Sequence, residues 1–409
     1  MKETRGSNES RLFWLGVVLC TLYQSYRYPL QINSAGTSPT YSDTPLILQA
    51  GKFVLAFPLF ALALVECLRK TGPWRQWLIV LAALFLSTYS LLKVFGDKDP
   101  RYLDLSFWLL FSLVLVWAVD AVKVSALDRY LQYLLFYALG STLIEVILFF
   151  ALGRLPALAF EGTYLIRFGG FLDDPNGFSA ILFLLMGWSY SRFKGWARFF
   201  ILVGIVVSLL LTQSWTALAF LVLISLLWGL VGVSKRPVVA VVTICASALL
   251  VVAVIHAMPQ APAQIFEDML TAKQGSIEGH LFPWAQWFSR WTEWTLLGDW
   301  TYNPYESWWA GALINFGVPW LCVCVIFTAG LLFSLHGALS RAAREARPVY
   351  SGLFLFGCYF VFGCLNLPLF IVFPINFLFF LFSFLVAFGK IRPQRQLSFG
   401  DTPTMAPAE

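Results

Sequence analysis

A charged, glycine-bearing segment from Arg167 to Asn176 separates two long apolar runs of this chain. It reads Arg-Phe-Gly-Gly-Phe-Leu-Asp-Asp-Pro-Asn, and a bilayer protein places such residues together where water or a polar ligand can meet them. The guanidinium of Arg167 is a planar fork of donors that matches phosphate geometry. Gly169 and Gly170 allow the backbone to turn sharply or to approach a ligand. The segment is therefore a candidate phosphate-binding loop.

The same segment has a structural interpretation that needs no ligand. Arg167 would then pair with Asp173 or Asp174 and order the loop, and on the residues alone this is the more ordinary reading. Pro175 and Asn176 are expected to open the next helix, because proline suits the first helical turn.

A second polar stretch, 258–307, carries two candidates for proton transfer. His280 can exchange a proton near neutral pH, which suits general acid–base chemistry. Glu306 stands just before an apolar run, where a carboxylate could act as a base. Each also has the plain interpretation of a solvated surface side chain.

Four tryptophans of this stretch are spaced by 3, 4 and 3 residues, which places them on one face of a helix: Trp284, Trp287, Trp291 and Trp294. Such a face suits an interfacial helix at headgroup level. It also suits stacking against sugar rings, and both roles can hold at once. Arg290 flanks this face as a spare cation.

Three charged residues fall inside apolar runs, near the predicted outer ends of their helices. They are Arg27, Lys52 and Glu145. Intramembrane charges usually face the protein interior and pair with one another, so we predict an ion pair between Lys52 and Glu145. In the alternative, Arg27 or Lys52 lines the path of an anionic lipid headgroup.

The amino-acid composition indicates which kind of secondary structure positions these residues. The chain is 59% hydrophobic and only 12% charged, whereas a soluble domain carries about 25% charged residues. An all-α polytopic membrane protein is therefore predicted. The seven cysteines lie in or beside apolar segments, which predicts neither a disulfide framework nor a metal site. The net charge of +6 comes from short clusters between apolar runs, so nucleic acid is not an expected partner.

A span needs roughly 20 mostly apolar residues, and the sequence predicts twelve of them. The division at Thr212-Gln213-Ser214 is made because the apolar stretch 199–233 is too long for one untilted helix. The predicted spans are 12–30, 44–66, 75–95, 104–123, 129–153, 176–193, 197–212, 214–233, 237–257, 308–335, 348–366 and 368–389.

Loop charges then set the orientation. With the N-terminus in the cytoplasm, every predicted inside segment carries at least two Lys or Arg residues, whereas the outside loops hold most of the acids. Both termini are therefore predicted to be cytoplasmic, with a disordered polar tail at 391–409. The inside connections are short and carry no nucleotide-binding motif, so chemistry is expected on the outer face, in loops 154–175 and 258–307.

Three blocks resemble the O-antigen ligase and polymerase superfamily. The first is Arg167-x-Gly-Gly-x-x-x-Asp-Pro-Asn176, and the second is the Thr212-x-Ser-x-x-Ala217 turn between two spans. The third is Ser276-x-x-x-His280 with Trp284, Gly298 and Glu306-Ser307. Trp215 and His280 stand where many members have arginine, and Glu306-Ser307 stands where ligases have His-Asn. The resemblance is closest to capsule, exopolysaccharide and O-antigen repeat-unit polymerases.

The resemblance implies a GT-C-like helical glycosyltransferase in the bacterial inner membrane, with a periplasmic active site and neither metal nor other cofactor. Its donor and acceptor would be oligosaccharides on undecaprenyl diphosphate. Arg167, helped by Arg290 or His280, would stabilise the leaving diphosphate. Glu306, or alternatively His280, would deprotonate the acceptor hydroxyl. The tryptophan face would hold the glycan.

The resemblance further divides the chain into spans at 1–153, a ligase-like core at 154–335, spans at 336–390 and the tail. Gly169, Gly170, Asp174 and Asn176 of the first block would belong to the substrate site. Two other functions stay open: a ligase that moves finished glycan to a lipid or protein acceptor, and a transporter of a lipid-linked or anionic solute. A chain-length regulator is an open partner, and the sequence does not reveal the sugars.

Overall fold

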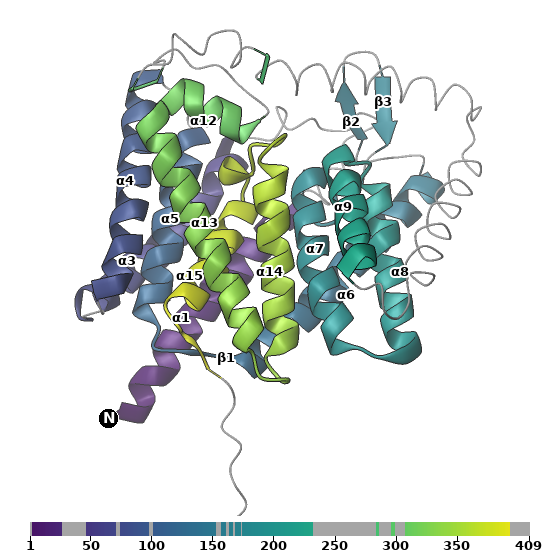
Figure 1. Cartoon of the computed structure of the whole chain (residues 1–409), viewed down its shortest axis with the longest axis horizontal. Helices are drawn as coiled ribbons and strands as arrows, with labels where there is room; N and C mark the ends of the chain where they lie inside the picture. Colours follow the sequence, from purple (N-terminus) through teal and green to yellow (C-terminus); the bar gives the residue numbers. More distant parts are fainter. Residues whose placement is uncertain are drawn as a thin grey trace, which may run out of the picture.

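The computed structural model shows a mostly helical protein (Figure 1). Two short strand pairs accompany the helices: β2 (Ala157–Phe160) pairs antiparallel with β3 (Thr163–Ile166), and β1 (Val122–Lys123) pairs in parallel with β4 (Ile391–Arg392). The structure describes residues 2–26, 46–70, 74–97, 101–152, 157–160, 163–166, 168–172, 174–231, 284–285, 296–298 and 307–392.

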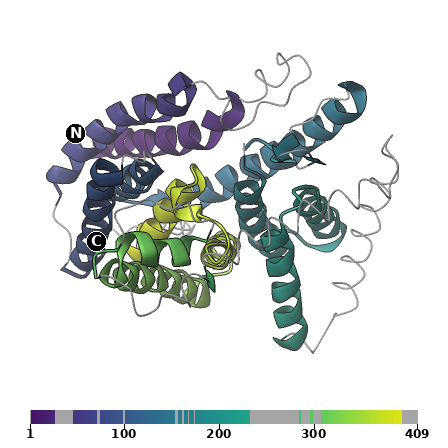
Figure 2. The same cartoon turned by 90° about the horizontal axis from the view of Figure 1, so that it is seen from above.

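The helices are arranged around α14 and α15. Seen from above, α1 and α3 lie along one side of the molecule and α6 to α9 along the other, with α14 and α15 between them (Figure 2). In chain order the helices are α1 (Lys2–Leu22), the 3-10 helix η1 (Tyr23–Tyr26), α3 (Leu46–Leu68), α4 (Trp74–Asp97), α5 (Arg101–Ala118), α6 (Val124–Leu152), α7 (Pro175–Arg192), α8 (Gly195–Leu211), α9 (Trp215–Val231), α12 (Trp308–Phe316), α13 (Val318–Arg341), α14 (Arg347–Gly363), the 3-10 helix η4 (Leu369–Ile371) and α15 (Ile375–Ala387).

Among the described residues, four helices are long and apolar enough to cross a membrane, by length and composition: Ala50–Leu68, Gln76–Val94, Val124–Leu148 and Val318–Arg341. Shorter apolar helices, such as those in α5, α8, α9 and α15, accompany them. These helices support the predicted all-α membrane class. The division at 212–214 is confirmed, since α8 ends at Leu211 and α9 begins at Trp215. The predicted span 237–257 lies outside the described residues.

The prediction of one continuous span at 308–335 is wrong. Helix α12 ends at Phe316 and α13 begins at Val318, with Gly317 between them at φ +85°. A glycine in this left-handed region ends a helix at little cost, and Pro319 in the first turn of α13 suits a new start. The apolar run hides this break, because hydrophobicity does not report the backbone angle.

The prediction of one span at 368–389 is also wrong in its first part. Pro368 precedes the 3-10 turn η4, and Pro374 immediately precedes α15. Each proline removes an N–H donor and clashes with the preceding helical turn, so two prolines six residues apart favour a break in the helix. The apolar segment therefore enters the core as a short turn followed by a 13-residue helix.

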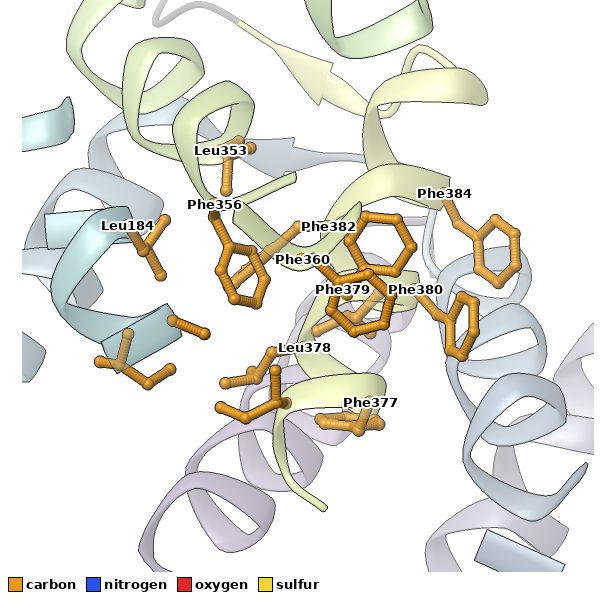
Figure 3. Packing of buried hydrophobic residues seen from close by; sticks show 14 of the residues in the cluster. Leu184, Leu353, Phe356, Phe360, Phe377, Leu378, Phe379, Phe380, Phe382 and Phe384 are labelled. Atoms are coloured by element: carbon orange, nitrogen blue, oxygen red, sulfur yellow. The ribbon is translucent and has the colours of Figure 1, made fainter. Parts of the chain in front are cut away.

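Helix α15 forms the centre of the hydrophobic core. Every residue from Ile375 to Leu385 is buried, which is the pattern of a helix surrounded on all sides. Its phenylalanines meet those of α14, and the rings of Phe360 and Phe379 stack at 3.9 Å between centroids (Figure 3). Helices α5, α7, α13 and α14 all pack against α15. Aromatic packing at this centre joins the early and late parts of the chain.

Helices α7 and α14 approach each other through two facing glycines. A Cβ added at Gly352 would lie 2.7 Å from the carbonyl oxygen of Leu184 and 2.9 Å from the Cβ of Trp188. A Cβ added at Gly187 would lie 2.6 Å from the carbonyl oxygen of Ser351. Small residues at such a crossing let two helix backbones come together, which is a common packing device in membranes.

One end of the helical body, called here the basic end, holds residues 69–70, 116–123, 192–194, 341–347 and 390–392 and lies at the bottom of Figure 1. It gathers several predicted inside connections. The Lys390 ammonium donates to the carbonyls of Val116, Trp117 and Val119 at 2.9, 3.0 and 2.6 Å. Lys70 binds Asp120 at 2.8 Å at the same end. Cations suit the C-terminus of α5, where the last carbonyls lack helical partners. The position of these connections at one end agrees with predicted spans that alternate in direction. The compartment that this end faces stays a prediction.

The opposite end, called here the loop end, consists of the described residues of 168–176 (168–172 and 174–176), together with 212–215, 307–309 and 364–369. It is at the top of Figure 1, beside the β2–β3 pair and the start of α12. The segments come from four separate places in the sequence. The described part of the first block, the start of the second and Ser307 of the third lie here. Trp284 of the third block contacts Leu365 of this end, whereas Gly298 lies at the break between α12 and α13.

Candidate functional site

The glycine segment forms a tight turn against the end of α8. Phe168 donates its N–H to the carbonyl of Leu211 at 3.1 Å, and Leu172 donates to the carbonyl of Gly169 at 3.0 Å. Gly170 has φ +58°, and a Cβ there would overlap the ring of Phe178. The expectation that the glycines allow a sharp turn is therefore confirmed at Gly170, which both its backbone angle and its neighbour restrict to glycine.

A buried carboxylate holds this turn. The N–H of Gly170 donates to Oε2 of Glu145 at 2.8 Å, and Glu145 on α6 is 1% exposed. The predicted ion pair between Lys52 and Glu145 is thus wrong. The physical reason is helix packing: α3, which carries Lys52, packs against α5 rather than along α6.

Lys52 instead pairs with Asp104, at 2.6 Å between Nζ and Oδ1. The indole N–H of Trp108 donates to the same carboxylate oxygen at 2.8 Å, and the ammonium lies over the rings of Phe53 and Phe373. Sequence reasoning missed Asp104, because it was taken as the start of a span. The available signal was its spacing of four residues from Trp108, which places both on one face of a helix.

Asp174 caps the N-terminus of α7. Its carboxylate accepts the N–H groups of Asn176 and Gly177, both at 3.0 Å, and Pro175 is the first residue of the helix. This confirms that Pro175 and Asn176 open the helix, since an aspartate cap followed by proline is a strong start signal. The carbonyl of Asn176 accepts the Tyr359 hydroxyl at 3.4 Å. A substrate role for Asp174 and Asn176 stays a prediction.

The second block lies directly beside the first. The Thr212 hydroxyl, which is buried, donates to the carbonyl of Leu209 at 2.7 Å and lies 3.2 Å from the hydroxyl of Ser179 on α7. Gln213 has φ +49°, the left-handed angle that ends α8, and the side chain of Trp215 is 54% exposed. Two blocks that are far apart in sequence therefore share one end of the α7–α8 pair.

The described parts of the third block also reach the loop end. The indole N–H of Trp284 donates to the carbonyl of Leu365 at 3.2 Å. Ser307 caps α12, and the N–H of Trp309 donates to the carbonyl of Cys364 at 3.4 Å. Both contacts are with the segment that follows α14. Tyr359, on the last turns of α14, reaches the first block, so this helix lies between the first and third blocks.

A short segment of the third block is locked against the break between α12 and α13. Gly298 has φ +72°, and a Cβ there would lie 2.5 Å from the carbonyl carbon of Asn315 and 2.7 Å from the nitrogen of Gly317. The Tyr89 hydroxyl donates to the carbonyl of Leu297 at 2.7 Å. Gly298 is one of the residues that carry the resemblance. This close contact between backbones explains why a glycine stands there. Sequence reasoning missed Tyr89 and placed Gly317 inside one continuous span, since neither residue has a local signature of its role.

Several candidate residues lie outside the described residues, and their roles stay predictions. They are Arg27, Arg167, Asp173, His280, Trp287, Arg290, Trp291, Trp294 and Glu306. Phe168 and Ser307, which adjoin Arg167 and Glu306 in the sequence, lie at the loop end. Within the described part of the chain, no three His, Cys, Asp or Glu side chains are close enough together to hold a metal ion.

The chemistry that this arrangement allows follows from its donors and turns. The described backbone presents tight turns at Gly170 and Gln213 beside the start of α7.

No known family model matches the chain, and no curated protein matches it closely enough to indicate a relationship. The case for a function therefore depends on the residues and their arrangement.

Proposed function

We propose that the chain is a membrane glycosyltransferase that joins oligosaccharide repeat units carried on undecaprenyl diphosphate. One observation carries the proposal: the first two blocks that resemble the polymerase superfamily meet at the loop end, and Trp284 and Ser307 of the third block reach the same end. Phe168 contacts Leu211, Ser179 contacts Thr212, and Trp284 contacts Leu365. Motifs dispersed in the sequence but clustered in space are what a shared substrate site requires.

The proposed reaction needs a cation at the leaving group and a base at the acceptor. The acceptor hydroxyl oxygen attacks the anomeric carbon of the donor sugar, and the bond from that carbon to the diphosphate oxygen breaks. The diphosphate leaves with the electron pair, and Arg167 stabilises the charge that develops on it. The hydroxyl proton passes to Glu306. Arg290 and His280 are the proposed helpers.

The proposal also gives the finer features of the fold and location. The helical body would be a GT-C-like bundle of twelve spans in the bacterial inner membrane, with the basic end in the cytoplasm and the loop end facing the periplasm. Two properties support this orientation. The basic end carries Lys70, Arg192 and Lys390, and the loop end carries the turns of the proposed site.

We expect Arg167→Ala to abolish long-chain polymer while the protein stays in the membrane. Loss of one fixed donor to a developing negative charge typically costs about a hundredfold to a thousandfold in rate. The measurement is the length distribution of lipid-linked glycan in cells, together with the amount of protein in the membrane. Arg341→Ala is the matched control, because Arg341 is exposed at the basic end and donates to Gly337 of its own helix at 2.9 Å.

Normal chain lengths in Arg167→Ala would refute the proposed role of this residue. The nature of the product tests the reaction itself. A lengthened lipid-linked glycan supports the polymerase, whereas a new conjugate on another lipid or on a protein would indicate a ligase.

We expect Glu306→Gln to stop transfer while donor binding stays measurable. The amide keeps the size of the side chain but cannot take up the hydroxyl proton, and a general base contributes about a hundredfold to ten-thousandfold. Single-turnover transfer and binding of the lipid-linked donor are measured on the purified protein. Glu345→Gln, an exposed acid at the basic end, is the control. Full activity in Glu306→Gln would remove this residue as the base and leave His280 as the alternative.

A further inference from the structure

Glu145 is a carboxylate buried inside a membrane-type helix. It is 1% exposed and lies within the candidate span Val124–Leu148 of α6. Ionisable side chains within membrane spans are rare and usually serve a site. A hydrogen bond between Glu145 and the glycine turn indicates which site it serves.

One partner of Glu145 is the amide of Gly170. The Gly170 N–H donates to Oε2 of Glu145 at 2.8 Å, and the turn has little freedom to move elsewhere. Phe178 fills the space beside the Gly170 Cα, and the Phe168 N–H is bound to the carbonyl of Leu211. A hydrogen bond to a carboxylate is roughly twice as strong as one to a neutral acceptor. Glu145 therefore supplies a strong fixed contact to this turn.

A second side chain of α6 contacts the same turn. The ring of Tyr137 packs on that of Phe171, with 4.6 Å between centroids. The turn is thus attached to α6 through Glu145 and Tyr137, and to α8 through its contact with Leu211. Attachment to two helices gives the segment one defined position rather than that of a loose loop.

We propose that Glu145 is a positioning residue of the transferase site: its carboxylate fixes the Gly170 amide and so sets the position of the turn 168–172, which follows Arg167 in the sequence. The inference rests on the proposed function, since Arg167 stands three residues before Gly170. A displacement of about 1 Å at a charge-stabilising group can cost about a hundredfold in rate. Positioning therefore acts mainly on kcat, because the leaving-group charge develops in the transition state.

The test compares variants that keep a side-chain hydrogen-bond acceptor at position 145 with variants that lack one. Glu145→Gln retains an oxygen that can accept the Gly170 N–H, whereas Glu145→Leu and Glu145→Ala do not. Thr142→Val is the matched control, because the Thr142 hydroxyl is buried on the same helix and donates to the carbonyl of Ala138 within it. Two properties are measured on the full-length protein: hydrogen exchange of the peptide that covers 168–172, and kcat and KM for transfer between lipid-linked repeat units.

In Glu145→Leu and Glu145→Ala we expect exchange at 168–172 to rise about tenfold or more, since a charged hydrogen bond is lost. We expect kcat to fall at least about tenfold with a smaller change in KM. Glu145→Gln should lie closer to wild type in both properties, and Thr142→Val should match wild type. If Glu145→Leu does not fold, the comparison of Gln with Ala remains.

Two results would overturn the inference. Unchanged exchange at 168–172 in Glu145→Ala would show that the carboxylate does not hold the turn. Equal kcat in Glu145→Gln and Glu145→Ala would show that the acceptor oxygen is not what matters. Either result is distinct from failure of the proposed function, which is tested separately by normal polymer in Arg167→Ala.

Discussion

Leucine in place of Gly352 is expected to leave little folded protein. The Cβ alone would lie 2.7 Å from the Leu184 carbonyl oxygen, which belongs to the backbone of α7 and cannot swing away. Helices α7 and α14 would have to separate along their crossing, and α14 would lose its place against α15. Overpacking of a core commonly costs about 1–3 kcal/mol and can cost more where backbone is the obstacle. We expect the upper part of this range or beyond.

The measurement is the amount of monodisperse protein after extraction into mild detergent, with its melting temperature. Gly330→Leu on α13 is the matched control, because a Cβ at Gly330 meets nothing within 4 Å. The control should extract and melt as wild type does. A Gly352→Leu protein with wild-type yield and melting temperature would mean that the two helices do not cross as closely as described.

The second large effect is expected at the buried ion pair. Lys52→Met removes the cation and leaves the Asp104 carboxylate with the Trp108 N–H as its remaining described contact. The side chains of Lys52 and Asp104 are 12% and 13% exposed, so water compensates little. Removing one partner of a buried pair costs about 3–5 kcal/mol, because a charge stays buried without its counter-charge.

The double variant Lys52→Met/Asp104→Asn should recover most of that loss. The asparagine is neutral and its side-chain oxygen can still accept the Trp108 N–H, so no uncompensated charge remains. Thermal unfolding of wild type, both single variants and the double variant gives the coupling energy. The exposed pair of Arg69 with Glu66 is the control, and Arg69→Met should cost less than about 1 kcal/mol. Additive losses in the double variant would contradict the pairing of Lys52 with Asp104.

The sequence predicted those features of the fold that have local causes. Asp174 and Pro175 signal a helix start within two residues, and the polar Thr212-Gln213-Ser214 turn interrupts an apolar run. Gly317 escaped prediction, because nothing in an apolar composition reveals a positive φ.

Partners across helices were predicted less well than helix ends. Lys52 was matched to Glu145 by depth alone, whereas its actual partner is set by the packing of α3 on α5. The depth of a charged residue in its span limits which charges it can meet. It does not determine which helices lie side by side. The contact between the glycine turn and the Thr212 turn was not predicted, since hydrophobic patterns carry no information on which loops meet.

The contact of Lys390 with the end of α5 bears on how the protein is made. The carbonyls of Val116, Trp117 and Val119 accept the Lys390 ammonium, which lies 271 to 274 residues later in the chain. A ribosome adds residues from the N-terminus onward, so α5 is synthesised long before this cation exists. During that interval water, lipid headgroups or a chaperone must satisfy those carbonyls. The segment that follows α15 therefore completes the end of α5, and this contact forms only after residue 390 has been synthesised.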